Sequence, residues 1–153
     1  MTNLEISLNK PSTPIRKWLV WLFLLFSFIG FLDAGYLAVK YYLGTPINCS
    51  FFDGCEKVTT SQYAAILGIP VALLGAIYYL FIFILAVAYF DTKKEKILYF
   101  TARFVFVGFF VSLWFLYLQL FIIKAVCLYC IFSAITSIIL FLLGLFVIKL
   151  QRK

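Results

Sequence analysis

Hydrophobic residues along this chain gather into four long runs, and short polar segments separate them. A helix needs roughly 20 residues to cross the hydrocarbon core of a bilayer, and each run is long enough. The pattern therefore predicts four membrane-spanning helices, over residues 18–42, 66–90, 97–123 and 125–148. The second and fourth runs contain no charged residue. The expected fold class is all-α: an integral membrane four-helix bundle that occupies residues 15–150 as one transmembrane domain.

The composition excludes an ordinary soluble domain. Hydrophobic residues make up 65% of the chain and charged residues 12%, which leaves too little polar surface to cover a globule. The net charge of +7 does not indicate a nucleic-acid-binding protein, because such a protein clusters its basic residues on one face. Here the basic residues stand between the apolar runs, as charges that flank a membrane do. We therefore expect membrane lipid, and no nucleic acid, as a partner.

The basic residues divide unequally between the two sides of the expected membrane. Four helices place both termini on one side, which receives nine Lys and Arg residues against three on the other. The nine are Lys10, Arg16, Lys17, Lys93, Lys94, Lys96, Lys149, Arg152 and Lys153, and the three are Lys40, Lys57 and Lys124. Basic residues accumulate on the cytoplasmic side of membrane proteins. We therefore expect a multi-pass protein of the cell (inner) membrane with both termini in the cytoplasm, residues 1–14 as a cytoplasmic tail and residues 43–65 as an outer loop.

Four cysteines stand in two groups, and this topology places both groups on the outer side. Cys49 and Cys55 lie in the outer loop, and Cys127 and Cys130 open the last helix. Because the outside of a cell is oxidising, one interpretation is a pair of structural disulfides in a non-catalytic, tetraspanin-like scaffold. A zinc site with four thiolate ligands is another alternative. Such sites usually occur in small soluble zinc-binding modules, whereas this site would lie half in lipid. We therefore expect no metal.

The spacing of Cys127 and Cys130 favours redox chemistry. A C-x-x-C pair at a helix start puts both sulfurs on one face, where unpaired N–H groups and the helix dipole stabilise a thiolate. A disulfide that closes so short a loop adds little stability, so a structural role explains the pair poorly. A loop pair and a membrane pair can together form a two-stage thiol–disulfide relay. Its final electron acceptor has to be lipid-soluble and take two electrons, which describes a quinone such as menaquinone or ubiquinone.

Together these residues resemble the vitamin K epoxide reductase family, in a bacterial-type form without a fused thioredoxin-like domain. The similarity spans about Trp18 to Ile148 and rests on the two cysteine pairs, on Ser61 after the loop pair, and on the segment FLDAGYLAVKYY. The resemblance implies a membrane thiol:quinone oxidoreductase. Such an enzyme generates disulfides in a separate thioredoxin-like protein on the outer side and passes the electrons to a quinone.

The resemblance also implies a role for each cysteine. Cys130 would react with the quinone, and Cys127 would exchange with Cys55. Cys49 would face the thioredoxin-like partner, and Ser61 would lie near the quinone pocket.

Three residues are candidates for contact with the quinone. Ser61 either caps the following helix or contacts the quinone, and the two roles are compatible. Asp33 lies inside the first apolar run, where it is either a proton donor to the reduced quinone or a buried packing residue. Tyr129 stands between the two cysteines of the C-x-x-C pair, so it is the aromatic residue we first expect to touch the substrate.

An enzyme of another family is a further alternative. A DsbB-type oxidase performs similar chemistry on a different four-helix bundle, with its C-x-x-C pair in the first outer loop and a wider pair in the second. In this chain the wider pair comes first. The order of the pairs therefore counts against a DsbB-type oxidase.

Overall fold

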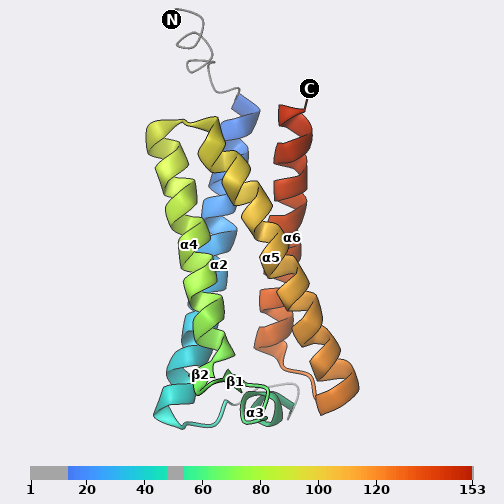
Figure 1. Cartoon of the computed structure of the whole chain (residues 1–153). Coiled ribbons are helices and arrows are strands. Elements are labelled where there is room, and N and C mark those ends of the chain that lie inside the picture. The colour runs from blue at the N-terminus through green and yellow to red at the C-terminus, as the bar shows by residue number, and fades with distance from the viewer. Residues whose placement is uncertain (1–13, 48–53, 153) are drawn as a thin grey trace, which may run out of the picture.

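Four long helices make up most of the computed structural model, which describes residues 14–47 and 54–152 (Figure 1). The helices are α2 (Pro14–Leu43), α4 (Val71–Thr92), α5 (Glu95–Tyr117) and α6 (Leu128–Gln151). Each is long and apolar enough to cross a membrane. The predicted all-α four-helix bundle is confirmed for the described residues.

The helices alternate in direction, so α2 begins and α6 ends at the same end of the bundle (Figure 1). α2 packs against α4 and α6, and α5 packs against α6 and α4. Lys93 closes the turn between α4 and α5, because its left-handed backbone (φ 54°) lets its N–H bond to the Tyr89 carbonyl. This end of the bundle is called the terminal end below, and the opposite end, which carries the short helix α3, is called the α3 end.

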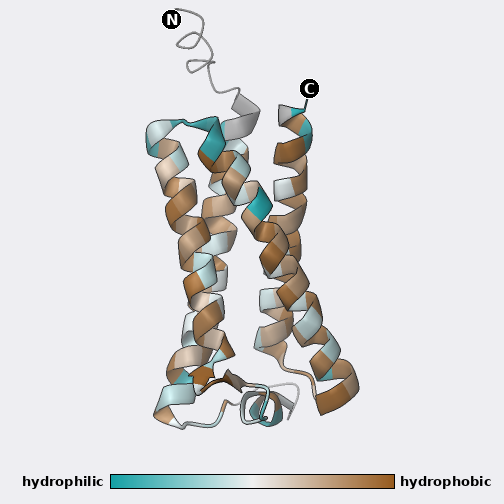
Figure 2. Cartoon of the chain, in the orientation of Figure 1, coloured by the Kyte–Doolittle hydropathy of each residue, from teal (hydrophilic) through white to brown (hydrophobic). Residues whose placement is uncertain are grey.

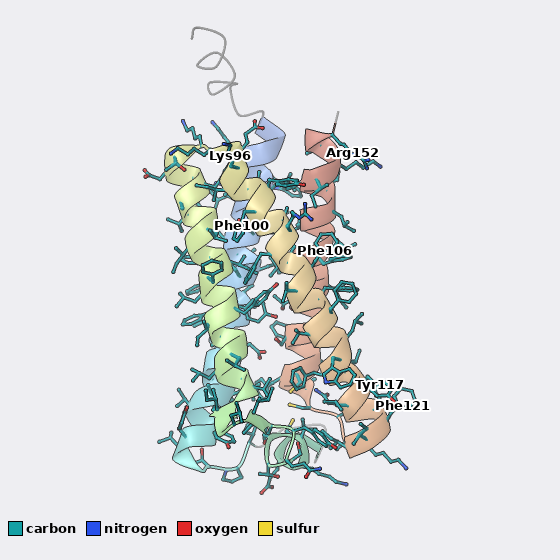
Figure 3. All side chains as sticks on the ribbon, viewed as in Figure 1. Lys96, Phe100, Phe106, Tyr117, Phe121 and Arg152 are labelled. Atoms are coloured by element: carbon teal, nitrogen blue, oxygen red, sulfur yellow. The ribbon has the colours of Figure 1, made fainter. Side chains whose placement is uncertain are left out.

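Apolar side chains cover the outside of the bundle as well as its inside (Figure 2). Phe100, Tyr117 and Phe121 are large and exposed, while Lys96 lies at the terminal end (Figure 3). Phe23 is fully buried in the core between the helices. An exterior this apolar is suited to lipid and not to water, in agreement with four membrane spans.

The connection between α2 and α4 contains a short helix and a small hairpin. The helix α3 spans Gly54–Thr59, and β1 (Ala65–Ile66) pairs antiparallel with β2 (Ile69–Pro70). The hydrophobic run predicts a helix from residue 66, but the hairpin delays the start of α4 to Val71. The reason is local: Leu67 has a left-handed backbone (φ 54°) that reverses the chain.

The connection between α5 and α6 also departs from the simple hydrophobic run. The last turn of the third span is a π-helix, η1 (Leu118–Ile123), and Lys124 after it is left-handed (φ 52°). The N–H groups of Lys124 and Ala125 both bond to the Gln119 carbonyl, which ends the helix and turns the chain. As a result α6 begins at Leu128, whereas the apolar run predicts a helix from residue 125.

Candidate functional site

The two cysteines of the C-x-x-C pair lie at the first turn of α6. Cys127 is the N-cap residue and has an extended backbone (φ −98°, ψ 119°), and Cys130 follows in the first helical turn. Both are free thiols. Cys127 is fully buried, while Cys130 is partly buried. The turn at Lys124 therefore places the pair at the start of a helix, where unpaired backbone N–H groups can donate hydrogen bonds to a thiolate.

The environment of Cys127 favours its thiolate. Hydrogen bonding from the Cys130 thiol lowers the pKa of Cys127 from 9.0 to about 7, against the effect of burial. The backbone N–H groups of Cys130 and Tyr129 contribute to the lowering. Near neutral pH a large fraction of Cys127 is therefore ionised, and an ionised thiol is both the attacking and the leaving group of disulfide exchange.

The loop helix α3 brings Cys55 to the same region. Cys55 is fully buried and disulfide-bonded. It belongs to one hydrophobic cluster with Cys127, Leu37, Ile47 and Val58, and Cys130 packs against this cluster, so the structure gathers three of the predicted site cysteines at the α3 end. Cys49 lies outside the described residues.

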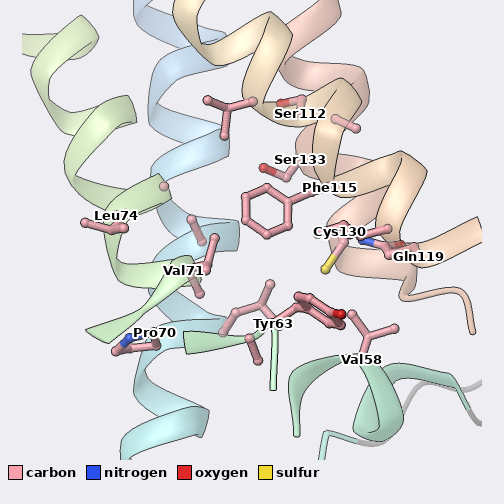
Figure 4. A pocket seen from close by; sticks show the side chains of 18 of the residues that line it. Val58, Tyr63, Pro70, Val71, Leu74, Ser112, Phe115, Gln119, Cys130 and Ser133 are labelled. Atoms are coloured by element: carbon pink, nitrogen blue, oxygen red, sulfur yellow. The ribbon is translucent and has the colours of Figure 1, made fainter. Parts of the chain in front are cut away.

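A cavity of about 460 Å³ lies between the helices at the α3 end, where α3 and the hairpin form one of its walls (Figure 4). Most of its lining is apolar, with side chains such as Val71, Leu74 and Phe115. Cys130 lines it, but Cys127 does not. Cys130 therefore differs from Cys127 in one respect: both are in contact with the loop cluster, but only Cys130 also lines the cavity.

The cavity wall also carries a hydrogen-bonded group of hydroxyls. The Tyr79 hydroxyl lies 2.8 Å from the Ser133 carbonyl oxygen and 3.0 Å from the hydroxyls of Ser133 and Ser137. The Tyr79 ring packs directly on Gly30, where a β-carbon would lie 2.6 Å from it. This group fixes α4 against α2 and α6 beside the cavity.

The three predicted substrate contacts lie in different places. Ser61 lines the cavity, and its hydroxyl donates to the Val58 carbonyl at 2.7 Å. The predicted cap role of Ser61 is wrong, because the hairpin separates it from α4 and Pro70 is the N-cap residue of that helix. Tyr129 packs on Tyr36, with ring centroids 5.3 Å apart, and is not among the described residues that line the cavity. Asp33 does not line it either, although its charge acts on Cys127. Contact of these three residues with the quinone stays a prediction.

Sequence reasoning missed several cavity residues, of which Gln119 is the most unusual. Gln119 lines the cavity beside Cys130 and is buried. A carboxamide within an otherwise apolar membrane run is the signal that would have indicated it, since polar groups in such runs are costly. Across residues 14–47 and 54–152, no three His, Cys, Asp or Glu side chains gather in a way that could hold a metal ion.

Comparison with known proteins agrees with this arrangement. No curated protein matches the chain. The sequence model of one family, however, matches residues 21–145, a segment that runs from α2 into α6 and contains both cysteine pairs and every described residue of the cavity wall. Because that match covers most of a four-helix bundle in which Cys130 of the C-x-x-C pair lines an apolar cavity, the chain belongs to the vitamin K epoxide reductase family.

Proposed function

We propose that this protein oxidises the thiols of a separate thioredoxin-like protein and passes the electrons to a membrane quinone. Membership of the family supports an oxidoreductase in a membrane, and the quinone, the partner and the direction of electron flow are the proposal. The observation that carries it is the division of the C-x-x-C pair. Cys130 lines an apolar cavity, whereas Cys127 does not and is buried in the cluster that contains Cys55, against which Cys130 also packs.

The division suggests an electron path through the chain. In this path Cys55 is joined to Cys49 as a loop disulfide, which takes two electrons from the partner's two thiols, and these become a disulfide. When Cys127 and Cys130 are joined as a disulfide, the reduced Cys55 attacks Cys127 and forms a mixed disulfide, and Cys130 leaves as a thiolate. The second loop thiol then attacks Cys55 and releases Cys127, so the loop disulfide forms again and the Cys127–Cys130 disulfide is broken. Oxidation of that pair to a disulfide releases two electrons and two protons. A bound quinone would accept the two electrons and the two protons and leave as the quinol.

The cavity suits the head group of a lipid-soluble quinone. Its volume of about 460 Å³ lies in the range of small-molecule sites, and its lining is mostly apolar with a few polar groups. Leu74, Val107 and Val111 line the cavity and are also exposed on the outside of the bundle. The cavity wall is therefore continuous with the lipid-facing surface, which favours a ligand that arrives from the membrane.

The orientation of the protein in the membrane is part of the same proposal. With the basic terminal end in the cytoplasm, the α3 end and its cysteines face the extracytoplasmic side, where a disulfide-generating partner operates. A tetraspanin-like scaffold with two structural disulfides would have no use for a cavity beside Cys130. The family match also favours this function over a DsbB-type oxidase.

Quinone reduction by purified protein tests the proposal. The protein is mixed with a reduced thioredoxin-fold donor and, in separate reactions, with a short-chain ubiquinone or with menadione. We expect loss of quinone absorbance together with loss of donor thiols, one quinone for every two thiols. The Cys130→Ala variant should be inactive. Equal rates for wild type and Cys130→Ala would show that electrons do not pass through the C-x-x-C pair.

A further inference from the structure

Ser112, on α5, has a hydroxyl group without a hydrogen-bond partner in residues 14–47 and 54–152. A hydroxyl inside a helix ordinarily donates to a carbonyl about one turn earlier. Ser27, Thr101 and Thr136 do so, to carbonyls three or four residues before them. Ser112 does not, although it stands in a membrane-spanning helix, where an unpaired polar group is costly. Its hydroxyl is therefore a donor that the described part of the chain leaves unused.

The oxygen of Ser112 is accessible to a ligand in the cavity. Across the described residues, the buried side-chain oxygens and nitrogens that lack a partner belong to Asp33 and Gln119. The Ser112 oxygen also lacks a partner and is not among them, so this atom is not buried, although the residue is partly buried. Ser112 lines the cavity, and rotation about a single side-chain bond directs its O–H. A ligand there can accept this hydrogen bond without movement of the backbone.

The other hydroxyl groups in the half of the cavity away from α3 already have partners. The Tyr79 hydroxyl lies within hydrogen-bond distance of the hydroxyls of Ser133 and Ser137. The Tyr78 hydroxyl donates to a backbone carbonyl of α5 at 3.5 Å. Of the described residues that line this half of the cavity, Ser112 is therefore the one whose hydroxyl is free to donate to a ligand.

Ser112 and Cys130 stand at two levels of the same cavity. Gln119 lies beside Cys130, and Ser112 lies farther from α3 than either of them (Figure 4). Seven residues separate Ser112 from Gln119, so the two lie on one face of α5 about 10 Å apart along the helix. Phe115 lines the cavity between these levels, and its ring contacts no other aromatic ring of the described residues. A flat ligand can therefore stack on Phe115 and extend from Cys130 toward Ser112.

We propose that the Ser112 hydroxyl donates a hydrogen bond to one carbonyl oxygen of the quinone and so orients the ring, with the opposite carbonyl toward Cys130. A para-quinone carries its two acceptor oxygens on opposite sides of the ring, which suits a cavity with a donor at one level and the thiol at the other. A hydroxyl both donates and accepts, so the same group also pairs with the quinol. The inference rests on the proposed function and deepens it, because it names the residue that recognises the carbonyl.

Infrared spectroscopy of bound duroquinone tests this hydrogen bond. Duroquinone has two equivalent carbonyls when free, and its four methyl groups occupy every ring position at which a thiol would add. It is bound to protein with Cys127→Ala and Cys130→Ala, so that the C-x-x-C pair passes it no electrons. This parent protein is compared with the same protein carrying Ser112→Ala.

A hydrogen bond lowers the stretching frequency of the carbonyl that accepts it. In the parent protein we expect two carbonyl bands, one of them lowered, and Ser112→Ala should abolish the lowered band. Ser27→Ala is the matched control, because it removes a buried hydroxyl from α2 at a position that does not line the cavity, and it should keep the lowered band. A lowered band that persists in Ser112→Ala would assign the hydrogen bond to another donor and overturn the inference.

Dissociation constants, measured by calorimetry in detergent, separate recognition from packing. Ser112→Ala should weaken duroquinone binding roughly 3- to 10-fold, the effect of losing one hydrogen bond. Durene has the same ring and methyl groups without the carbonyls, and its binding should stay within about twofold. The melting temperature of unliganded Ser112→Ala should not fall, because no described protein group loses a partner. A lower melting temperature with equal weakening of both probes would show a structural role and overturn the inference.

Quinone reduction by the wild-type protein distinguishes this inference from the proposed function. If wild type reduces quinone but bound duroquinone shows no lowered band, the inference alone fails. If wild type reduces no quinone with any thiol donor, yet the lowered band appears and depends on Ser112, the proposed function fails and the hydrogen bond stands. If wild type reduces no quinone and the lowered band is absent, both fail.

Discussion

Gly54, the first residue of α3, lies against the backbone of Val126, directly before Cys127. A β-carbon at Gly54 would lie 2.6 Å from the Val126 carbonyl oxygen and 2.8 Å from its nitrogen. Both atoms belong to the main chain, so they cannot move aside as a flexible side chain would. The absence of a side chain at Gly54 therefore allows α3 to bring Cys55 into the cluster that contains Cys127.

Gly54→Ala should separate the loop pair from the C-x-x-C pair. Overpacking of this kind costs about 1–3 kcal/mol, which α3 can avoid by moving away from Val126. Quinone reduction driven by a reduced thioredoxin-fold donor should fall by roughly tenfold, because electrons then cross from Cys55 to Cys127 less often. Reduction driven by dithiothreitol should not fall, since movement of α3 away from Val126 uncovers the buried Cys127 for a small dithiol. Stopped-flow measurement of quinone absorbance with each donor gives the two rates.

Gly35→Ala is the matched control, because a β-carbon at Gly35 meets no atom within 4 Å. It should leave both rates at the wild-type level. A Gly54→Ala protein that loses both rates equally would indicate general damage to the fold and not a fault in docking.

The lowered pKa of Cys127 predicts a pH dependence. A thiol with a pKa of about 7 is ionised above neutral pH and becomes protonated as the pH falls below it. In reduced protein with Cys49→Ser and Cys55→Ser, ultraviolet thiolate absorbance should rise with a midpoint near pH 7. Cys130→Ala removes the hydrogen-bond donor that contributes most to the lowering of this pKa. The midpoint should therefore move upward, toward 9.0. A midpoint that stays in place would assign the lowering to the backbone N–H groups.

The same shift predicts how the stability of the reduced protein changes with pH. Because the folded pKa lies below the value of 9.0 for an ordinary thiol, folded protein binds fewer protons than unfolded protein between the two values. The contribution of Cys127 to stability is therefore complete above pH 9 and is lost as the pH falls through 7. Thermal unfolding of the reduced protein across this range, with Cys127→Ala as the comparison, measures the contribution.

The sequence predicts the bundle better than it predicts the site. Four apolar runs identify four spans, because crossing a hydrocarbon core imposes a length on each helix. Hydrophobicity does not locate the starts of α4 and α6, since the apolar pattern continues through the residues on either side of Leu67 and Lys124, where the backbone turns. Backbone conformation and not polarity sets where these two helices begin.

The cysteines and Ser61 can be identified as site candidates from the sequence, because their spacing indicates a site even when the fold is not known. Gln119 and Tyr79 are not, because each acquires its role from a partner on another helix. Tyr79 is one aromatic residue among many in apolar runs until α6 brings Ser133 and Ser137 to its hydroxyl. Tertiary proximity between distant segments is the information that the pattern alone lacks.

Tyr79→Phe should destabilise the bundle without disturbing its packing. The ring stays in place against Gly30, while the contacts of the hydroxyl with Ser133 and Ser137 are lost. We expect a loss of about 1–2 kcal/mol, because buried groups lose a partner. Thermal unfolding followed by circular dichroism measures it. Tyr42→Phe, at a side chain that is 64% exposed, should have no effect. Equal stability of the two variants would mean that the buried hydroxyl contributes nothing.

Orientation in the membrane is tested with two single cysteines at opposite ends of the bundle. The four native cysteines are first replaced by serine. Leu67→Cys then places a thiol at the tip of the hairpin, where the native side chain is 98% exposed, and Lys94→Cys places one in the exposed turn between α4 and α5. The excess of basic residues at the terminal end predicts that this end faces the cytoplasm. A membrane-impermeant maleimide applied to intact cells should therefore label Leu67→Cys at once and Lys94→Cys only after the membrane is opened. The reverse pattern would place both cysteine pairs in the reducing cytoplasm, where thiols stay reduced and a disulfide-generating oxidase would have no stable product.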